Sequence, residues 1–146
     1  MNSPITVADL LRNKGTEVWS LSPDCSIREA LSIMASKNVG ALPVVTRGLI
    51  EGIFSERDFA RKAADPSFKI DEHCVSGLMT RSVLCVSPRE SIEACMALMT
   101  QKKIRHLPVV EDGVLSGIIS IGDVVNALIT AQRENIDYLN TYINGR

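Results

Sequence analysis

The sequence is poor in aromatic residues, has almost no net charge and lacks a long apolar run. Only 4% of its 146 residues are aromatic, and the formal net charge is −1. An extended nucleic-acid surface needs clustered cations and stacking platforms, which this composition does not supply. No apolar run reaches the ~18 residues of a membrane span, and no secretory signal is visible. We therefore expect a cytoplasmic protein without a nucleic-acid or membrane partner.

The cysteines lack the spacing of a metal site. The four cysteines are Cys25, Cys74, Cys85 and Cys95, and no paired C-x-x-C motif occurs among them. In a reducing compartment such residues behave as small apolar side chains, so we expect no disulfide framework and no required metal. A redox or metal sensor built on Cys74, Cys85 and Cys95 stays open as an alternative.

What the chain does contain is an internal repeat. Residues 18–62 align with residues 83–127 without a gap, and 16 of the 45 positions are identical, against roughly 6% expected from composition. A short upstream stretch, residues 7–11, also repeats at residues 75–79. A unit of about 60 residues rarely builds an adequate core alone. The two copies are therefore expected to pack on each other with pseudo-twofold symmetry.

Each copy predicts the order strand, helix, strand, strand, helix after a short helical lead-in. The expected first strands are residues 18–21 and 83–86, each stopped by Ser-Pro. Apolar runs around the glycine turns at Gly48 and Gly113 predict hairpins, and the second helices are expected at residues 56–64 and 121–131. The predicted organisation is a first repeat at 7–64, a connector at 65–74, a second repeat at 75–131 and a C-terminal helical tail at 132–146.

One motif recurs where the last strand of each copy should meet its second helix. It reads Gly52-x-x-Ser55-x-x-Asp58 in the first copy and Gly117-x-x-Ser120-x-x-Asp123 in the second. Ser-x-x-Asp is an N-terminal capping signature that needs no ligand. The same helix start favours phosphate, and a preceding glycine would let a ligand approach the backbone. Capping and ligand binding can both hold.

The arrangement resembles the cystathionine β-synthase (CBS) domain pair, or Bateman module, from about residue 7 to about residue 131. The motifs that carry this resemblance are Pro23-Asp24-x-x-Ile27, Leu42-Pro43-Val44-Val45 and Gly52-Ile53-Phe54-Ser55-Glu56-Arg57-Asp58, with counterparts Pro88 with Ile92, His106-Leu107-Pro108-Val109-Val110 and Gly117-Ile118-Ile119-Ser120-Ile121-Gly122-Asp123. It implies an α/β (α+β) fold of tandem CBS domains, with two pseudo-twofold-related β-α-β-β-α repeats in one compact module.

The function that the resemblance implies is regulatory ligand sensing. Such a module binds an adenine nucleotide (AMP, ADP, ATP or NAD(H)) in the cleft between its repeats and signals by conformational or oligomeric change. A homodimer and an unidentified regulated protein are the expected partners, and no catalytic residues are expected. Two alternatives stay open: a scaffold that has lost ligand binding, and a module that binds S-adenosylmethionine.

The resemblance also implies a set of ligand-binding residues. The two aspartates would accept hydrogen bonds from ribose hydroxyls, and the strand starts near Pro43 and Pro108 would read the adenine edge. The phosphate candidates are Arg57, Arg105 and His106, for which a solvated charge or a hydrogen-bonded imidazole at the core edge is the alternative. The full set is Ser20, Pro23, Ala41, Leu42, Pro43, Ser55, Arg57, Asp58, Cys85, Pro88, Arg105, His106, Leu107, Pro108, Ser120, Gly122 and Asp123.

Overall fold

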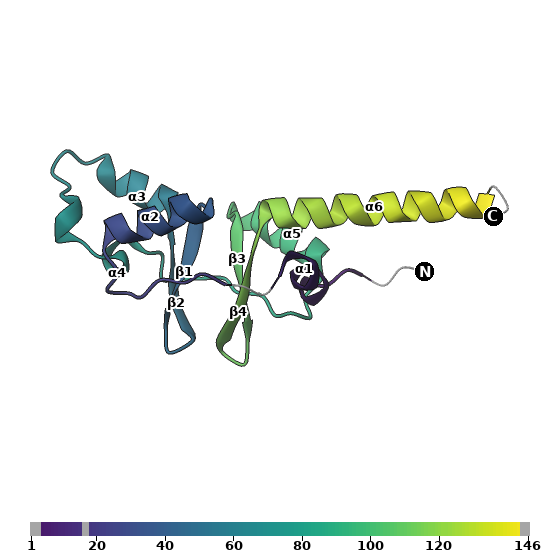
Figure 1. Ribbon diagram of the computed structural model, residues 1–146, viewed down its shortest axis with the longest axis horizontal. Helices are drawn as coiled ribbons and strands as arrows, with labels where there is room; N and C mark the ends of the chain where they lie inside the picture. Colours follow the sequence, from purple (N-terminus) through teal and green to yellow (C-terminus); the bar gives the residue numbers. More distant parts are fainter. Residues whose placement is uncertain (1–3, 16–17, 144–146) are drawn as a thin grey trace.

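The computed structural model describes residues 4–15 and 18–143, which form two similar halves side by side (Figure 1). The first half contains α2 (Ile27–Lys37), β1 (Ala41–Thr46), β2 (Leu49–Ser55) and α3 (Glu56–Ala63). The second contains α5 (Ile92–Lys102), β3 (His106–Glu111), β4 (Val114–Ser120) and α6 (Ile121–Ile143). The lead-in helices are α1 (Val7–Lys14) and α4 (Val75–Leu78), and the connector carries the short 3₁₀ helix η1 (Ile70–Glu72). The predicted repeat of helices and hairpins is therefore confirmed.

The sheet joins the two hairpins only at their tips. Its strand order is β1-β2-β4-β3, and β2 pairs with β4 at the single position Leu49–Val114. Each hairpin turns through two residues with positive φ, such as Arg47 (54°) and Gly48 (81°) in the first. A two-residue hairpin turn needs positive φ at both residues for its twist to match the right-handed twist of the strands. The pairing between the two hairpins therefore lies next to their turns.

The prediction of a first strand in each repeat is wrong. In the structure, a single bridge residue stands in its place. Leu21 bridges Val44 in parallel, with Leu21 N–H donating to Pro43 O and Val45 N–H donating to Leu21 O. The next parallel bonds would need N–H groups at Pro23 and Pro43, and proline has none. Val86 and Val109 form the equivalent bridge in the second half. Pro88 and Pro108 stand at the corresponding positions, so that ladder cannot grow either.

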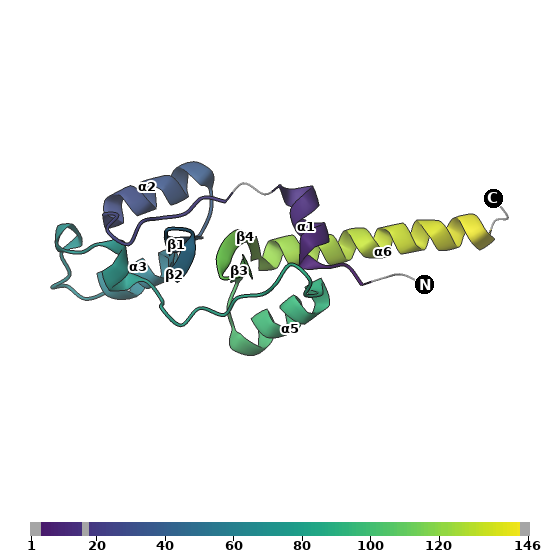
Figure 2. The ribbon, with the colours of Figure 1, turned by 90° about the horizontal axis from the view of Figure 1, so that it is seen from below.

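The lead-in helices cross over, so that each completes the core of the other half. Helix α1 adds Val7, Leu10 and Leu11 to the core built from α5, β3, β4 and α6. Helix α4 adds Val75 and Leu78 to the core of the first half. Figures 1 and 2 both show α1 beside α6 rather than beside α2. Because of this exchange, the core of the second half is incomplete without α1, and the core of the first half is incomplete without α4.

Helix α6 continues without a break from the second repeat into the tail. The sequence predicted a helix to residue 131 and a further amphipathic stretch, but α6 runs from Ile121 to Ile143. The chain between residues 124 and 143 has no glycine or proline that would end it. Val125, Ile129 and Ile136 are exposed along it. Among the described residues, no helix is both long and apolar enough to cross a membrane.

Candidate functional site

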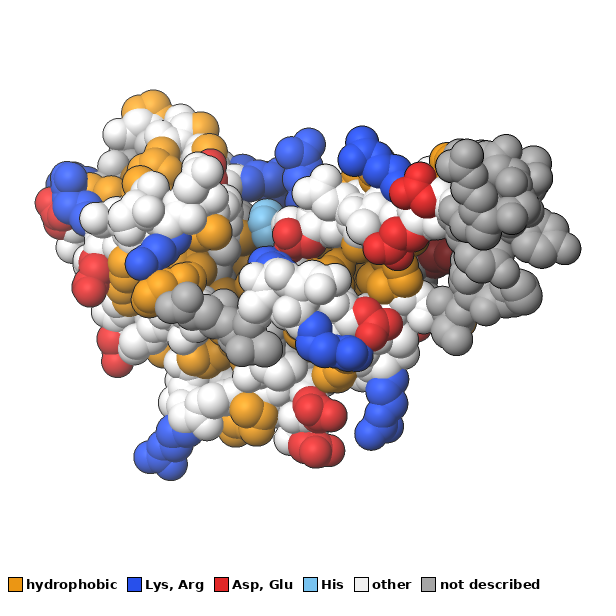
Figure 3. All heavy atoms as spheres, turned by 45° about the vertical axis from the view of Figure 1, so that its right-hand side comes forward, with side chains coloured by type: hydrophobic (Ala, Val, Ile, Leu, Met, Phe, Trp, Pro, Cys, Tyr) orange, Lys and Arg blue, Asp and Glu red, His pale blue; other side chains and the backbone are white. Residues whose placement is uncertain are grey.

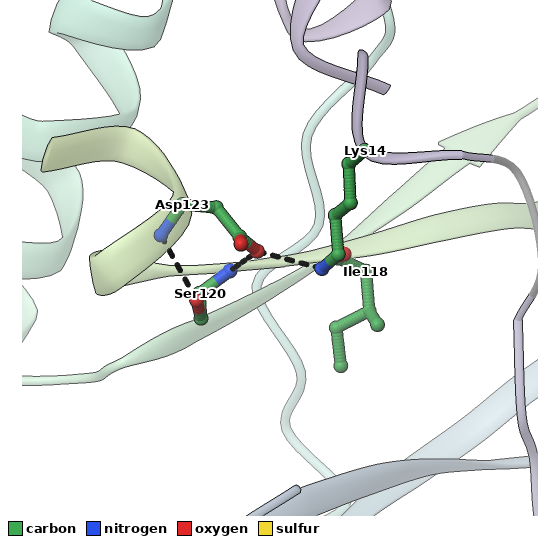
Figure 4. Close-up of polar contacts among 4 residues, drawn as sticks. All are labelled: Lys14, Ile118, Ser120 and Asp123. Atoms are coloured by element: carbon green, nitrogen blue, oxygen red, sulfur yellow. Dashed lines mark hydrogen bonds and ion pairs between the residues drawn. The ribbon is translucent and has the colours of Figure 1, made fainter. Parts of the chain in front are cut away.

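The two Ser-x-x-Asp motifs form the corners where β2 meets α3 and β4 meets α6. In the first, Ser55 N–H donates to Asp58 Oδ2 at 2.9 Å and Asp58 N–H donates to Ser55 Oγ at 3.1 Å. In the second, Ser120 N–H donates to Asp123 Oδ2 at 2.8 Å and Asp123 N–H donates to Ser120 Oγ at 3.1 Å (Figure 4). The capping interpretation is therefore confirmed at both corners. Each carboxylate thus stabilises the start of its own helix.

The helix starts offer fewer free donors than the sequence suggested. Glu56 N–H donates to Gly40 O at 3.0 Å, and Ile121 N–H donates to Arg105 O at 2.9 Å. Together with the two capping bonds at each corner, these bonds occupy most of the first-turn N–H groups that would otherwise attract an anion. A phosphate at either corner would therefore depend mainly on side chains.

The strand register brings several of the expected site residues together. Ala41 lies opposite Ser55, and His106 lies opposite Ser120. The next residues, Leu42 and Leu107, are buried in the two cores, so they can offer a ligand only their backbone. Pro43 and Pro108 are buried as well, and their carbonyl groups accept the bridge bonds from residues 21 and 86.

The remaining expected residues lie at the edges of the corners. Ser20 and Cys85 are exposed, each next to a bridge residue. The carbonyl of Pro23 accepts a bond from Ser76 N–H at 3.0 Å, and that of Pro88 accepts one from Ala8 N–H at 2.9 Å. These two prolines therefore hold the crossing lead-in segments in place.

The motif glycines face protein, not open space. A Cβ atom built on Gly52 would lie 2.7 Å from Thr80 O, and one built on Gly117 would lie 3.0 Å from the Cδ atoms of Leu11. The expectation that these glycines leave room for a ligand is therefore wrong. They leave room for the lead-in segments that cross from the other repeat.

The crossing segments also bring two residues to the aspartates that sequence reasoning missed. Thr80 Oγ1 donates to Asp58 Oδ1 at 3.2 Å. Lys14 Nζ donates to Asp123 Oδ2 at 2.6 Å and to Ile118 O at 2.8 Å (Figure 4). Both residues follow or end a lead-in helix, but their proximity depends on the exchange of α1 and α4. The repeat pattern alone could not have revealed it.

Positive charge gathers around Asp123. Burial raises the pKa of Asp123, but hydrogen bonds from Lys14 and Ser120 together with the Lys14 charge outweigh it and hold the pKa below its usual range. Burial lowers the pKa of His106, and the charges of Lys14 and Arg105 lower it further, against an opposing effect of Asp123. Arg105 and His106 therefore lie in one electrostatic environment. Arg57 lies exposed at the start of α3, in the other half.

A groove of about 470 Å³ lies between α1 and α6 on one side of Asp123. It is lined by Ile5, Asp9, Leu10, Asn13, Lys14, Asp123, Asn126, Ala127, Thr130, Ala131 and Glu134. On the other side, His106 lies against the first half, with its Cε1 4.0 Å from a Cβ built on Gly40. Figure 3 shows positive and negative side chains interspersed over one face of the molecule, without a field of a single sign.

The three cysteines of the sensor alternative differ in their surroundings. Cys95 is buried in the second core, whereas Cys74 forms a backbone β-bridge with Ser26 in the first half. Cys85 is exposed. In the described part of the chain, no three His, Cys, Asp or Glu side chains are grouped to hold a metal ion. The metal-sensor alternative therefore has no ligand set among these residues.

Comparison with known proteins places the chain in a family. The CBS domain family model matches residues 7–65 and 75–130. The mitochondrial CBS domain-containing protein CBSX3 of Arabidopsis thaliana is 35% identical over 96% of this chain and 72% of its own. The crystal structure of the CBS domain NE2398 is 42% identical, with a TM-score of 0.81 over 86% of this chain and 98% of its own. The crystal structure of CBSX2 in complex with AMP is 29% identical, with a TM-score of 0.72 over 88% of this chain and 98% of its own. The chain belongs to the CBS domain family and consists, over nearly its whole length, of one CBS domain pair.

Proposed function

We propose that this CBS pair is a regulatory module that binds an adenine nucleotide at the corners marked by Asp58 and Asp123. The observation that carries this proposal is the recurrence of the same corner in both repeats, each with a half-buried carboxylate at a strand end. The likeness to CBSX2, whose structure contains AMP, supports the adenosine part of the ligand. The ligand would be AMP, ADP, ATP or NAD(H).

Each residue type at a corner has a distinct part in this proposal. Asp58 and Asp123 accept hydrogen bonds from the ribose hydroxyls while they continue to cap their helices. The backbone at Ala41 and His106, opposite the capping serines, reads the adenine edge. Arg57, Arg105 and His106 meet the phosphates, because little backbone N–H capacity is free at the helix starts.

The proposed output is a shift between two arrangements of the pair or of its dimer. A ligand shifts such a population only by the difference in its affinity for the two states. We propose a homodimer, with the exposed face of α6 at Val125, Ile129 and Ile136 as its contact surface. A regulated protein would read the change, and the module itself would be non-catalytic. A cytoplasmic location stays a prediction, since the relative CBSX3 is mitochondrial.

Calorimetric titration of the whole chain with AMP, ATP, NADH and S-adenosylmethionine tests the proposal. Saturable heat and a higher melting temperature with at least one of the three nucleotides are expected. Absence of both effects with all three nucleotides would reject it. Binding of S-adenosylmethionine alone would favour that alternative. Mass spectrometry of small molecules released by heating the purified protein would identify the ligand directly.

A further inference from the structure

We propose that Lys14 makes the corner at Asp123 selective for phosphorylated adenosine, by turning its amine from the carboxylate to the phosphate of the ligand. At the first corner, no ion pair holds Asp58 among the described residues. This inference rests on the proposed function and assigns the two sites different ligand preferences.

The amine of Lys14 lies at the atom where the ribose should bind. Its Nζ is 2.6 Å from Asp123 Oδ2 and 2.8 Å from Ile118 O. The side chains of Lys14 and Asp123 are only 37% and 24% exposed. Charges in this position are less screened than those at an open surface. A ligand entering the corner must therefore either share the carboxylate with the amine or attract the amine away.

Two cations, Lys14 and Arg105, lie on the His106 side of the corner at Asp123, whereas Asp9 and Glu134 lie along the groove side. The charges of Lys14 and Arg105 both act on His106, and that of Asp123 opposes them. With Asp123 engaged by Lys14, Arg105 still lacks a carboxylate partner among the described residues. A phosphate would bring negative charge to this corner, whereas adenosine would bring none.

The Lys14 side chain has space in which to move. It lines the groove of about 470 Å³ between α1 and α6, so its outer side is not packed against a wall of the core. Its flexible four-carbon stem carries a compact charge that can change partners without a change in the backbone.

The corresponding contact in the first half is neutral. Asp58 receives its outside hydrogen bond from the Thr80 hydroxyl at 3.2 Å, and Thr80 follows α4, the repeat counterpart of α1. The two corners therefore share the capping aspartate but differ in the residue that the crossing segment brings to it. A hydroxyl cannot distinguish a phosphorylated ligand by charge, whereas an amine can.

The experiment titrates AMP and adenosine into full-length protein that carries Asp58→Ala, so that the second corner alone is measured. In this background, Lys14→Met is expected to weaken AMP binding about tenfold or more, the effect typical of a lost charge-assisted hydrogen bond, and to leave adenosine within about twofold. Lys14→Arg should keep most of the AMP affinity. Arg12→Met is the matched control, because Arg12 lies on the same helix and forms an ion pair of 2.6 Å with Asp9.

Equal losses for AMP and adenosine would show a structural role for Lys14 and overturn the inference, as would unchanged AMP affinity. If circular dichroism shows that Lys14→Met is unfolded, Lys14→Gln makes the same comparison with a neutral side chain that can still donate to Asp123. Failure of the proposed function looks different, because protein with both aspartates intact would then bind neither AMP nor adenosine.

Discussion

Gly52 lies directly against the backbone of Thr80. A Cβ atom on Gly52 would stand 2.7 Å from Thr80 O, and the neighbouring Ile53 exchanges two backbone hydrogen bonds with Thr80, of 3.0 and 2.8 Å. In the second half, Gly117 instead faces the side chain of Leu11. Both glycines of the repeated motif thus admit a crossing lead-in segment, one through backbone and the other through a flexible side chain.

Replacing Gly52 with alanine should destabilise the protein more than the same change at Gly117. The carbonyl of Thr80 is fixed by its bonds to β2 and cannot yield, whereas Leu11 can change rotamer. We expect a loss of about 2 kcal/mol for Gly52→Ala, in the range of overpacking, and less for Gly117→Ala. Urea denaturation followed by circular dichroism measures both. Gly77→Ala is the control, since nothing lies within 4 Å of its Cβ position. A smaller loss at Gly52 than at Gly117 would contradict this explanation.

Substitution of either motif aspartate should remove one site and one helix cap together. Asp58→Ala and Asp123→Ala should each cost about 1 kcal/mol of stability through the lost cap and reduce the number of nucleotides bound per chain. Asp9→Ala separates the two effects, because Asp9 forms the same capping box with Thr6 at the start of α1. The Asp9→Ala variant should be less stable than the wild type but should keep its nucleotide affinity at the Asp58 corner. Full stoichiometry in both site variants would refute the ribose assignment.

Protonation of His106 should destabilise the fold. Burial lowers its pKa from the ordinary 6.5, and Lys14 and Arg105 lower it further. The unfolded chain therefore takes up the proton at a higher pH than the folded one. The stability contributed by the neutral imidazole is complete above about pH 6.5 and is lost as the pH falls below it. His106→Gln should lose less stability than the wild type between about pH 7.5 and about pH 5.5. If the free energy of unfolding of the two proteins had the same pH dependence, this prediction would be wrong.

Cys95 should react with thiol reagents only when the protein unfolds. Burial, with a smaller effect of the Glu90 charge, raises its pKa to about 11, and its side chain is fully buried. The reactive thiolate is therefore rare and inaccessible in the folded state. Alkylation followed by peptide mass spectrometry should label the exposed Cys85 before Cys95, although burial also raises the pKa of the Cys85 thiol. If Cys85 and Cys95 were labelled at the same rate in native protein, this prediction would be wrong.

The exposed apolar face of α6 should determine self-association. Ile129 and Ile136 are 43% and 56% exposed, an unfavourable state for large apolar side chains that burial against a second copy would relieve. Sedimentation analysis is expected to give a dimer for the wild type and mainly monomer for a variant with Ile129→Glu and Ile136→Glu. Thr130→Glu, at a neighbouring exposed position on the same helix, controls for added charge. A dimer that survives the double substitution would place the contact elsewhere.

The repeat, its hairpins and its helix caps could be predicted from the sequence because they depend on local rules. Gly48 and Gly113 allow hairpin turns, and a serine three residues before an aspartate caps a helix wherever it starts. The absence of glycine and proline between residues 124 and 143 is equally local. The apolar pattern nevertheless predicted two helical stretches there, where α6 is a single helix.

The tertiary structure alone decided which segments meet. Two copies of one pattern give no information on whether a lead-in helix packs on its own repeat or on the other, because the apolar positions suit both. The exchange of α1 and α4 brings Lys14 to Asp123, 109 positions away, and Thr80 to Asp58. The sequence by itself therefore determined the family, the paired corners and their aspartates. The physical difference between the two corners, an amine at one and a hydroxyl at the other, arises only when the chain crosses over itself.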